Sequence, residues 1–193
     1  MNGVKQGKSV NMFSNVKMDI QQRIKAENKQ MGLVNLWLTW LTRSWLATLV
    51  YRFGRYAGDI KFRPLMIFCK VLYYPIFFLT QGITGISIQA HCRIAPGMVI
   101  RGAGGIFILA ESIGENFYVG SGVTVGNVRG SKNLPVIGNN VTIEPGAKIL
   151  GDVNIGHNVI IRGNSLVLTD IPDNTMAIGN PARIKKQPEK SEK

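Results

Sequence analysis

The chain contains very little cysteine and very little histidine. Two of its 193 residues are cysteine and two are histidine. Cys69 and Cys92 are too few for a disulfide framework, and no secretory leader is recognisable, so we expect a cytoplasmic protein with reduced thiols. His91 and His157 are the only imidazoles. We expect no bound metal.

Acidic residues are also scarce. The chain has 23 Lys and Arg against 11 Asp and Glu, which gives a formal net charge of +12. Residues 1–85 hold twelve of the basic residues and three of the acidic ones. No recognised nucleic-acid-binding motif accompanies this charge, so we do not expect a nucleic-acid partner. We interpret residues 1–83 as a basic, aromatic-rich α-helical region.

Two apolar runs approach the length that spans a membrane, and each carries one basic residue near its middle. Residues 33–51 and 63–79 are apolar enough to form buried helices, but Arg43 and Lys70 lie near their middles. A charge at that depth is costly in hydrocarbon, which argues against a transmembrane hairpin. Two interpretations remain open. The helices pack on the rest of the protein and on sister subunits, or they lie on an anionic membrane surface as a peripheral attachment.

An aliphatic residue, in contrast, returns at almost every sixth position from residue 88 to residue 167. One step is of seven residues and one, before Ile137, is of twelve. The position four residues after each anchor is often apolar or small as well. The anchors are Ile88, Ile94, Ile100, Ile106, Ile113, Val119, Val125, Ile137, Ile143, Ile149, Ile155, Ile161 and Val167.

A period of six fits neither an α-helix, which needs about 3.6, nor an ordinary strand, which needs about 2. It predicts a mainly β fold, a left-handed parallel β-helix in which each hexapeptide forms one side of a triangular coil. Gly and Asn are expected at the corners, where φ is positive. The expected β-helix covers residues 84–184, with an extruded loop at 127–135, and a charged tail covers 185–193. A β-sandwich rarely keeps one register over so many units.

Four stretches of the chain resemble a known family. They are TGISI at 84–88, GGI at 104–106, PGAKILG at 145–151 and GNPARI at 179–184. Residues 86–183 are similar to the serine O-acetyltransferase branch of the hexapeptide acyltransferases. The similarity is greatest to members encoded with bacterial polysaccharide biosynthesis genes, and the helical region resembles the same branch loosely.

The resemblance implies a homotrimer with three active sites, each between neighbouring β-helices. It implies acetyl-CoA as acyl donor and a histidine that takes the proton of the acceptor hydroxyl. The position of that histidine is Gly102 in this sequence. Arg101 stands where an aspartate precedes it, and Ser87 stands where a carboxylate orients it. The catalytic base is therefore unassigned.

Two residues, His157 and Glu111, are candidates for a replacement base. His157 follows its anchor by two residues, as Gly102 does, which suggests that the two share a face about three coils apart; a solvated turn residue is the alternative. Glu111 would serve if it were desolvated. His91 is expected on a different face, in a surface or interface role. Cys92 is expected to be a buried, inert thiol.

The acyl-donor side matches the family better. By resemblance Gly146, Ala147 and Gly163 line the acetyl-CoA groove. Basic side chains are expected to meet the CoA phosphates: Lys148, Arg183, Lys185 and Lys186. The alternative is that the coil itself requires the small residues and that the tail lysines are solvated.

These observations lead to two hypotheses about function. The first is an acetyl-CoA-dependent O-acetyltransferase of a polysaccharide or envelope glycan pathway, at the inner face of the membrane, with a sugar hydroxyl rather than L-serine as acceptor. The second is a catalytically silent trimer that serves as a structural or regulatory partner, because the expected histidine is Gly102.

Overall fold

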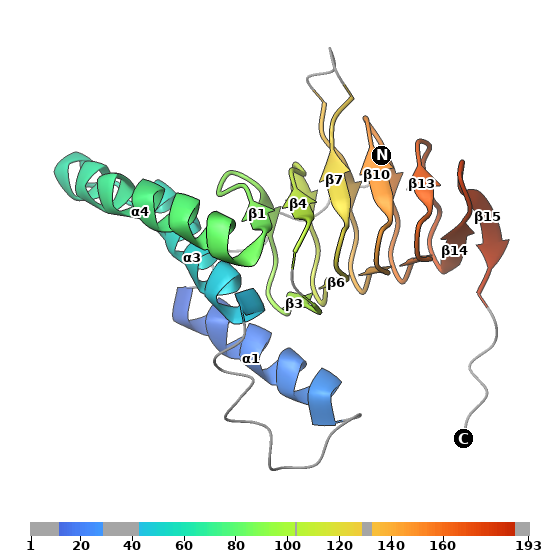
Figure 1. Cartoon of the computed structure of the whole chain (residues 1–193), viewed down its shortest axis with the longest axis horizontal. Coiled ribbons are helices and arrows are strands. Elements are labelled where there is room, and N and C mark those ends of the chain that lie inside the picture. The colour runs from blue at the N-terminus through green and yellow to red at the C-terminus, as the bar shows by residue number, and fades with distance from the viewer. Residues whose placement is uncertain (1–11, 29–42, 103, 129–132, 188–193) are drawn as a thin grey trace.

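Three helices precede a β-helix in the computed structural model, which describes residues 12–28, 43–102, 104–128 and 133–187 (Figure 1). The helices are α1 (Met12–Asn28), α3 (Arg43–Asp59) and α4 (Arg63–Thr84). The apolar run predicted over 33–51 is helical from residue 43 onward, and its first part lies outside the described residues.

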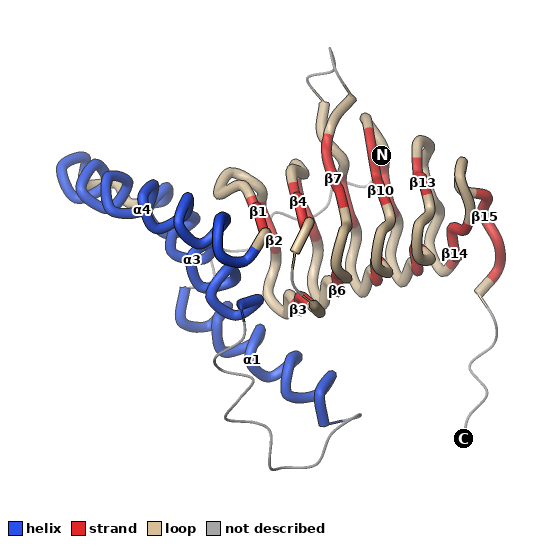
Figure 2. The backbone as a smooth tube through the Cα atoms, viewed as in Figure 1, coloured by secondary structure: helices blue, strands red, loops and turns tan. Residues whose placement is uncertain are grey.

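The strands form three sheets, which are the three faces of the β-helix. Figure 2 shows how strands and turns alternate along the chain. Face 1 contains β1 (Ile86–Ile88), β4 (Ile106–Ile108), β7 (Thr124–Gly126), β10 (Lys148–Leu150) and β13 (Leu166–Val167). Face 2 contains β2 (Arg93–Ile94), β5 (Ser112–Ile113), β8 (Val136–Ile137) and β11 (Asn154–Ile155). Face 3 contains β3 (Val99–Ile100), β6 (Tyr118–Val119), β9 (Thr142–Ile143), β12 (Ile160–Ile161), β14 (Thr175–Ile178) and β15 (Arg183–Lys186). Within each face the strands run parallel, except that β15 is antiparallel to β14.

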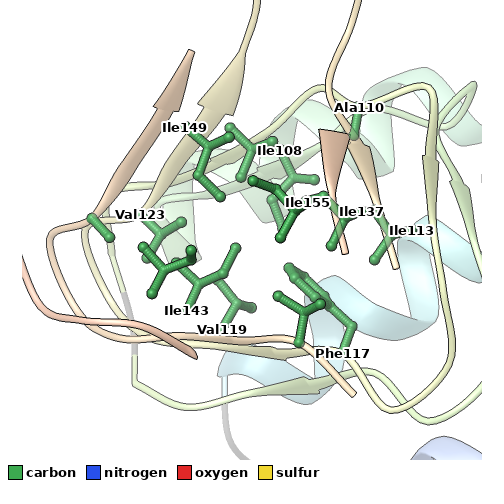
Figure 3. Packing of buried hydrophobic residues seen from close by; sticks show 14 of the residues in the cluster. Ile108, Ala110, Ile113, Phe117, Val119, Val123, Ile137, Ile143, Ile149 and Ile155 are labelled. Carbon is green, nitrogen blue, oxygen red and sulfur yellow. The ribbon is translucent and has the colours of Figure 1, made fainter. Parts of the chain in front are cut away.

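The six-residue period is confirmed as one face per hexapeptide. Each strand from β1 to β10 pairs in parallel with the strand three positions later, so one coil consists of three short sides. All thirteen anchors are buried. Figure 3 shows anchors such as Ile137, Ile143 and Ile149 converging on the interior together with Phe117. The core is thus a column of aliphatic layers inside the prism.

Asparagine forms a ladder at the corner between faces 2 and 3. Asn116, Asn140, Asn158 and Asn174 all have φ between 55° and 58°. The side-chain amide of each donates to the side-chain oxygen of the next, at 2.9 Å in all three steps. Asn tolerates the left-handed region and satisfies the corner at the same time. Gln22 of α1 donates to the Asn116 side-chain oxygen and so attaches the helical region to this ladder.

The long step before Ile137 is an insertion at one corner. Val125 lies on face 1 and Ile137 on the adjoining face 2, so the twelve residues advance the coil by one face. The described residues on either side of this insertion leave the β-helix beside β7 (Figure 1). Residues 129–132 of the expected loop at 127–135 lie outside the described part of the chain.

Side chains of α1 and α3 cover the first coil. The Tyr51 hydroxyl donates to the Cys92 carbonyl and accepts from the Ile94 amide, at 2.8 and 3.0 Å. Arg52 donates to the carbonyl oxygens of Ile94 and Ala95 and forms an ion pair with Asp19. These backbone groups at Cys92, Ile94 and Ala95 therefore have protein partners where no earlier coil exists to pair with them.

The Asp19–Arg52 pair is buried, with 1% and 2% of the side chains exposed. One Asp19 carboxylate oxygen also accepts from the amides of Gly97 and Met98, both at 2.8 Å. Burial raises the pKa of the Asp19 carboxyl, and Arg52 and the two amides act in the opposite direction. The pair fixes α1 and α3 to each other and to the β-helix.

Helix α4 packs on α3 and, at its C-terminal end, on β1. The approach is close because Gly54 of α3 leaves room for the Tyr73 ring, which a Cβ atom would meet at 2.3 Å. Gly85, in the left-handed conformation, ends α4 and leads directly into β1. Among the described helices, α4 is long and apolar enough to cross a membrane by length and composition, and 11% of its most apolar window is buried.

Candidate acetyl-CoA site at the corner between faces 3 and 1

A strip without side chains runs along the corner between faces 3 and 1. Gly105, Gly122 and Gly146 lie on successive coils, all with positive φ. A Cβ atom on Gly105 would meet the Cα atom of Gly122 at 3.4 Å, and one on Gly122 would meet that of Gly146 at 3.6 Å. We call these three residues the glycine strip. It presents bare backbone over three coils, which suits the extended amide-containing arm of an acyl-CoA.

Charged side chains lie at the far end of this strip. Lys148 is exposed on β10, just beyond Gly146, and Arg183 is exposed where β15 begins. Arg183 follows a turn that is held against β13, because the Ala182 amide donates to the Leu166 carbonyl at 2.7 Å. Both cations are thus placed to meet phosphate groups at this corner.

Glu144 and Arg162 pair at the same corner, 2.7 Å apart. The second carboxylate oxygen of Glu144 accepts from the Gly163 amide at 2.9 Å. The expected groove residue Gly163 therefore lies at the site, with its amide already bonded within the chain. Asn164 takes the place of a glycine on this coil, and its side-chain oxygen covers Gly146. The strip ends here.

Gly102 also lies at this corner, on the first coil, with φ +98°. A Cβ atom at Gly102 would meet the Ser121 hydroxyl oxygen at 2.0 Å. Ser121, on the next coil, thus fills the space that a side chain at position 102 would enter. The Ser44 hydroxyl of α3 donates to the Gly102 carbonyl at 2.7 Å. The position of the expected base is therefore closely packed as well as empty of a titratable group.

His157 does not share the corner of Gly102, contrary to the prediction. It lies between faces 2 and 3, because the insertion before Ile137 advances the coil by one face rather than two. Its Nδ1 accepts from the Asn139 amide at 2.9 Å, and its own amide donates to Asp173. His157 is a turn residue in this chain, which was the alternative.

Glu111 and His91 lie at the third corner, between faces 1 and 2, both exposed. The loop at 127–135 leaves the β-helix at this same corner. Ser87 is buried on β1, and Gln89 donates to its hydroxyl at 3.5 Å. Arg101 places its guanidinium 5.4 Å from the centre of the Tyr118 ring. The chain therefore brings none of the predicted bases to the glycine strip on its own.

The other predicted donor-site residues are distributed unevenly. Ala147 points into the core and is fully buried, so its side chain does not reach a ligand. Lys185 and Lys186 follow β15 away from the corner, because β15 runs antiparallel to β14 and Lys186 pairs with Thr175 at the opposite end. The placement of Gly146, Lys148 and Arg183 suits the predicted role, which stays a prediction.

Sequence reasoning missed Gly105, Gly122, Ser121 and the Glu144–Arg162 pair. A signal for the ion pair existed, since 18 residues separate Glu144 from Arg162 and three hexapeptides make one coil. The glycine strip has no such signal. Its spacing is irregular, because the insertion before Ile137 falls between Gly122 and Gly146.

Comparison with known proteins agrees with this geometry. Residues 135–169 match the family model described as bacterial transferase hexapeptide (six repeats). These residues are similar to the hexapeptide-repeat transferases, and the relatives and solved structures that match the chain are serine acetyltransferases.

A serine acetyltransferase of Synechococcus elongatus is 35% identical over 109 residues, covering 55% of this chain and 45% of the relative. One from Staphylococcus epidermidis is 38% identical over 112 residues, covering 56% of this chain and 53% of the relative. The chain thus spans about half the length of the curated relatives it matches.

Solved structures match over more of the chain. Neisseria gonorrhoeae serine acetyltransferase in complex with serine has a TM-score of 0.71 at 25% identity, covering 88% of this chain and 69% of that one. A serine acetyltransferase in complex with CoA has a TM-score of 0.74 at 27% identity, covering 90% and 69%. Both comparisons include the helical region.

These relatives correct the expectation about the acceptor. A sugar hydroxyl in a polysaccharide or envelope glycan pathway was wrong, because the relatives are serine acetyltransferases and point to serine O-acetylation. The polysaccharide-associated branch is not supported, and the alternative of a catalytically silent trimer stays a prediction. The histidine expected at position 102 and the carboxylate expected at position 87 would act in proton transfer. They carry no information about which hydroxyl is acetylated.

Proposed function

We propose that this protein is an acetyl-CoA-dependent serine O-acetyltransferase. The observation that carries the proposal is the glycine strip with Lys148 and Arg183 at its far end, in a chain whose homologues are serine acetyltransferases. The strip accommodates the pantetheine arm against bare backbone. The two cations meet the phosphates as charge-assisted partners.

The proposed reaction needs positioning and one proton transfer. The serine hydroxyl oxygen attacks the thioester carbonyl carbon, a C–O bond forms and the C–S bond breaks. The hydroxyl proton leaves through a base and reaches the departing thiolate, which gives CoA. Alignment of the two bound reactants lowers the barrier by itself. A positioned base contributes roughly another 10²–10⁴ in rate.

We further propose that a neighbouring subunit supplies the base. In a cyclic trimer of triangular prisms, each interface joins two different surfaces of the same chain. One corner of a β-helix therefore contacts a different corner of its neighbour. His91 and Glu111 lie together at the corner between faces 1 and 2, where the loop at 127–135 also leaves the β-helix. A homotrimer would bring this corner against the glycine strip of its neighbour. We place the trimer in the cytoplasm.

The test is release of free CoA from acetyl-CoA by the purified full chain. L-alanine is the matched control for L-serine, because it differs by the hydroxyl alone. We expect serine-dependent release that saturates with serine and is absent with alanine. Equal release with serine, with alanine and with no acceptor would refute the proposal. His91→Asn and Glu111→Gln then identify the base, as the effective variant lowers turnover by roughly 10²-fold or more.

A further inference from the structure

We propose that α4 lies in the plane of an anionic membrane surface, with its apolar side among the acyl chains. The proposal goes beyond the acetyltransferase function and does not depend on it. Figure 1 shows α4 and α3 as an arm that projects from the first coil, away from the rest of the β-helix. The two sides of α4 carry different kinds of side chain.

A narrow side of α4 faces α3. Helical residues advance by about 100° each, so the buried and half-buried positions fall on one stripe. This stripe consists of Met66, Cys69, Tyr73, Phe77, Thr80 and Thr84. It is the kind of stripe by which a helix packs on one neighbour.

The opposite side is apolar over an arc of about 200°. Large exposed side chains occupy nearly every position of this arc: Leu65, Ile67, Phe68, Val71, Leu72, Tyr74, Ile76, Phe78, Leu79 and Ile83. Monomeric soluble proteins rarely leave such a continuous apolar surface to water. Acyl chains would cover the whole of this arc.

The polar residues of α4 follow one border of the arc. Arg63, Lys70 and Gln81 all fall at about 140–160° in a frame that places Leu65 at 0°, between the α3-facing stripe and the apolar arc. A helix that spans the bilayer would carry Lys70 into hydrocarbon, which is costly. In the plane of the surface, the same border sits at headgroup depth and the apolar arc points inward.

Charge favours an anionic surface over a neutral one. Helix α4 contains no Asp or Glu. Lys61, Phe62 and Arg63 are exposed at the turn between α3 and α4. Each basic residue near an anionic surface strengthens binding by roughly fivefold. The excess of basic residues in the helical region, noted in the sequence, thus has a partner.

The test is flotation of the full chain, without acetyl-CoA, with vesicles of phosphatidylcholine alone or mixed with phosphatidylglycerol. We expect flotation with the mixed vesicles. Phe68→Gln/Phe78→Gln should lower partitioning roughly tenfold or more. The matched control, Leu168→Gln/Ile178→Gln, removes two exposed apolar side chains from the β-helix and should bind as the wild type does.

A second pair of variants tests the charge and keeps the proposal testable if the phenylalanine variant unfolds. Lys61→Gln/Lys70→Gln should weaken binding to the mixed vesicles, and Lys17→Gln/Lys25→Gln on α1 should not. Absence of wild-type flotation would overturn the proposal. So would loss of self-association in the phenylalanine variant with unchanged flotation, which would assign the arc to a second copy of the chain.

Discussion

Gly102 lacks the side chain of a base, and Ser121 of the next coil occupies the space that such a side chain would need. The Ser121 hydroxyl lies where a Cβ atom would stand, and φ at Gly102 is +98°. Such a φ costs a non-glycine residue about 1–3 kcal/mol. The chain has therefore adapted to glycine at this position.

Introducing the histidine alone should accordingly fail. We expect Gly102→His to unfold at a lower temperature than the wild type and to gain no activity. Gly102→His/Ser121→Gly removes the clash, so we expect part of the stability to return. We expect no gain in serine-dependent CoA release over the wild type, because the neighbouring subunit is proposed to supply the base already. Ser121→Gly alone is the control. A fully stable single variant would show that Ser121 rearranges freely.

The two cysteines should differ sharply in reactivity. Cys92 is fully buried in the core, and burial raises the pKa of its thiol to about 11. Cys69 is half-buried on α4. A thiol reagent at pH 8 should therefore modify one thiol per native chain and two in denaturant, because the thiolate reacts. Cys69→Ser should leave the native protein unreactive. Rapid modification of Cys92 would show that the first coil opens.

At the scale of elements, the helical region is attached to the β-helix by a buried ion pair. Asp19 and Arg52 contact each other and four backbone groups of the first coil. Removing one member of such a pair leaves an uncompensated charge and costs about 3–5 kcal/mol. The exposed Arg55–Asp59 pair offers a comparison within α3.

We expect Arg52→Met to lower the free energy of unfolding by about 3–5 kcal/mol near pH 7. Without Arg52 the already raised pKa of Asp19 rises further. A folded-state pKa above the unfolded value stabilises the folded chain at acidic pH and loses that effect as pH rises. The difference in the free energy of unfolding between wild type and Arg52→Met should therefore be smaller at pH 5 than at pH 7. Urea unfolding at the two pH values measures it. Arg55→Gln should cost less than about 1 kcal/mol at either pH. Equal effects would show that the buried pair contributes little.

The six-residue repeat predicts the elements of the β-helix but not the contacts between distant elements. The period of six placed each anchor in the core, because burial repeats with the coil. The period could not assign His157 to a corner. The sequence does not show whether the twelve residues before Ile137 advance the coil by one face or by two, and the corner of His157 depends on that. Nor could it pair Asp19 with Arg52, because the two lie on different helices and meet only through the fold. The expected domain limits at residues 83 and 184 stay predictions.

For the whole molecule, position along the β-helix should decide which cations bind CoA. We expect Arg183→Gln to weaken CoA binding by roughly threefold to tenfold in calorimetry, because it removes one charge-assisted partner at the corner. Lys186→Gln removes the same charge at the far end of β15 and should leave the affinity unchanged. Similar losses in both variants would mean that net charge, rather than geometry, holds the donor.

The two ends of the solenoid differ in how their backbone is covered. Tyr51, Arg52 and Asp19 occupy the hydrogen-bonding groups of the first coil, and β15 folds back over the last coil on face 3. The outer edge of β15 carries the exposed residues Arg183, Lys185 and Lys186, and like charges on an edge strand discourage pairing with another chain. We therefore expect copies of this chain not to stack end to end through β15.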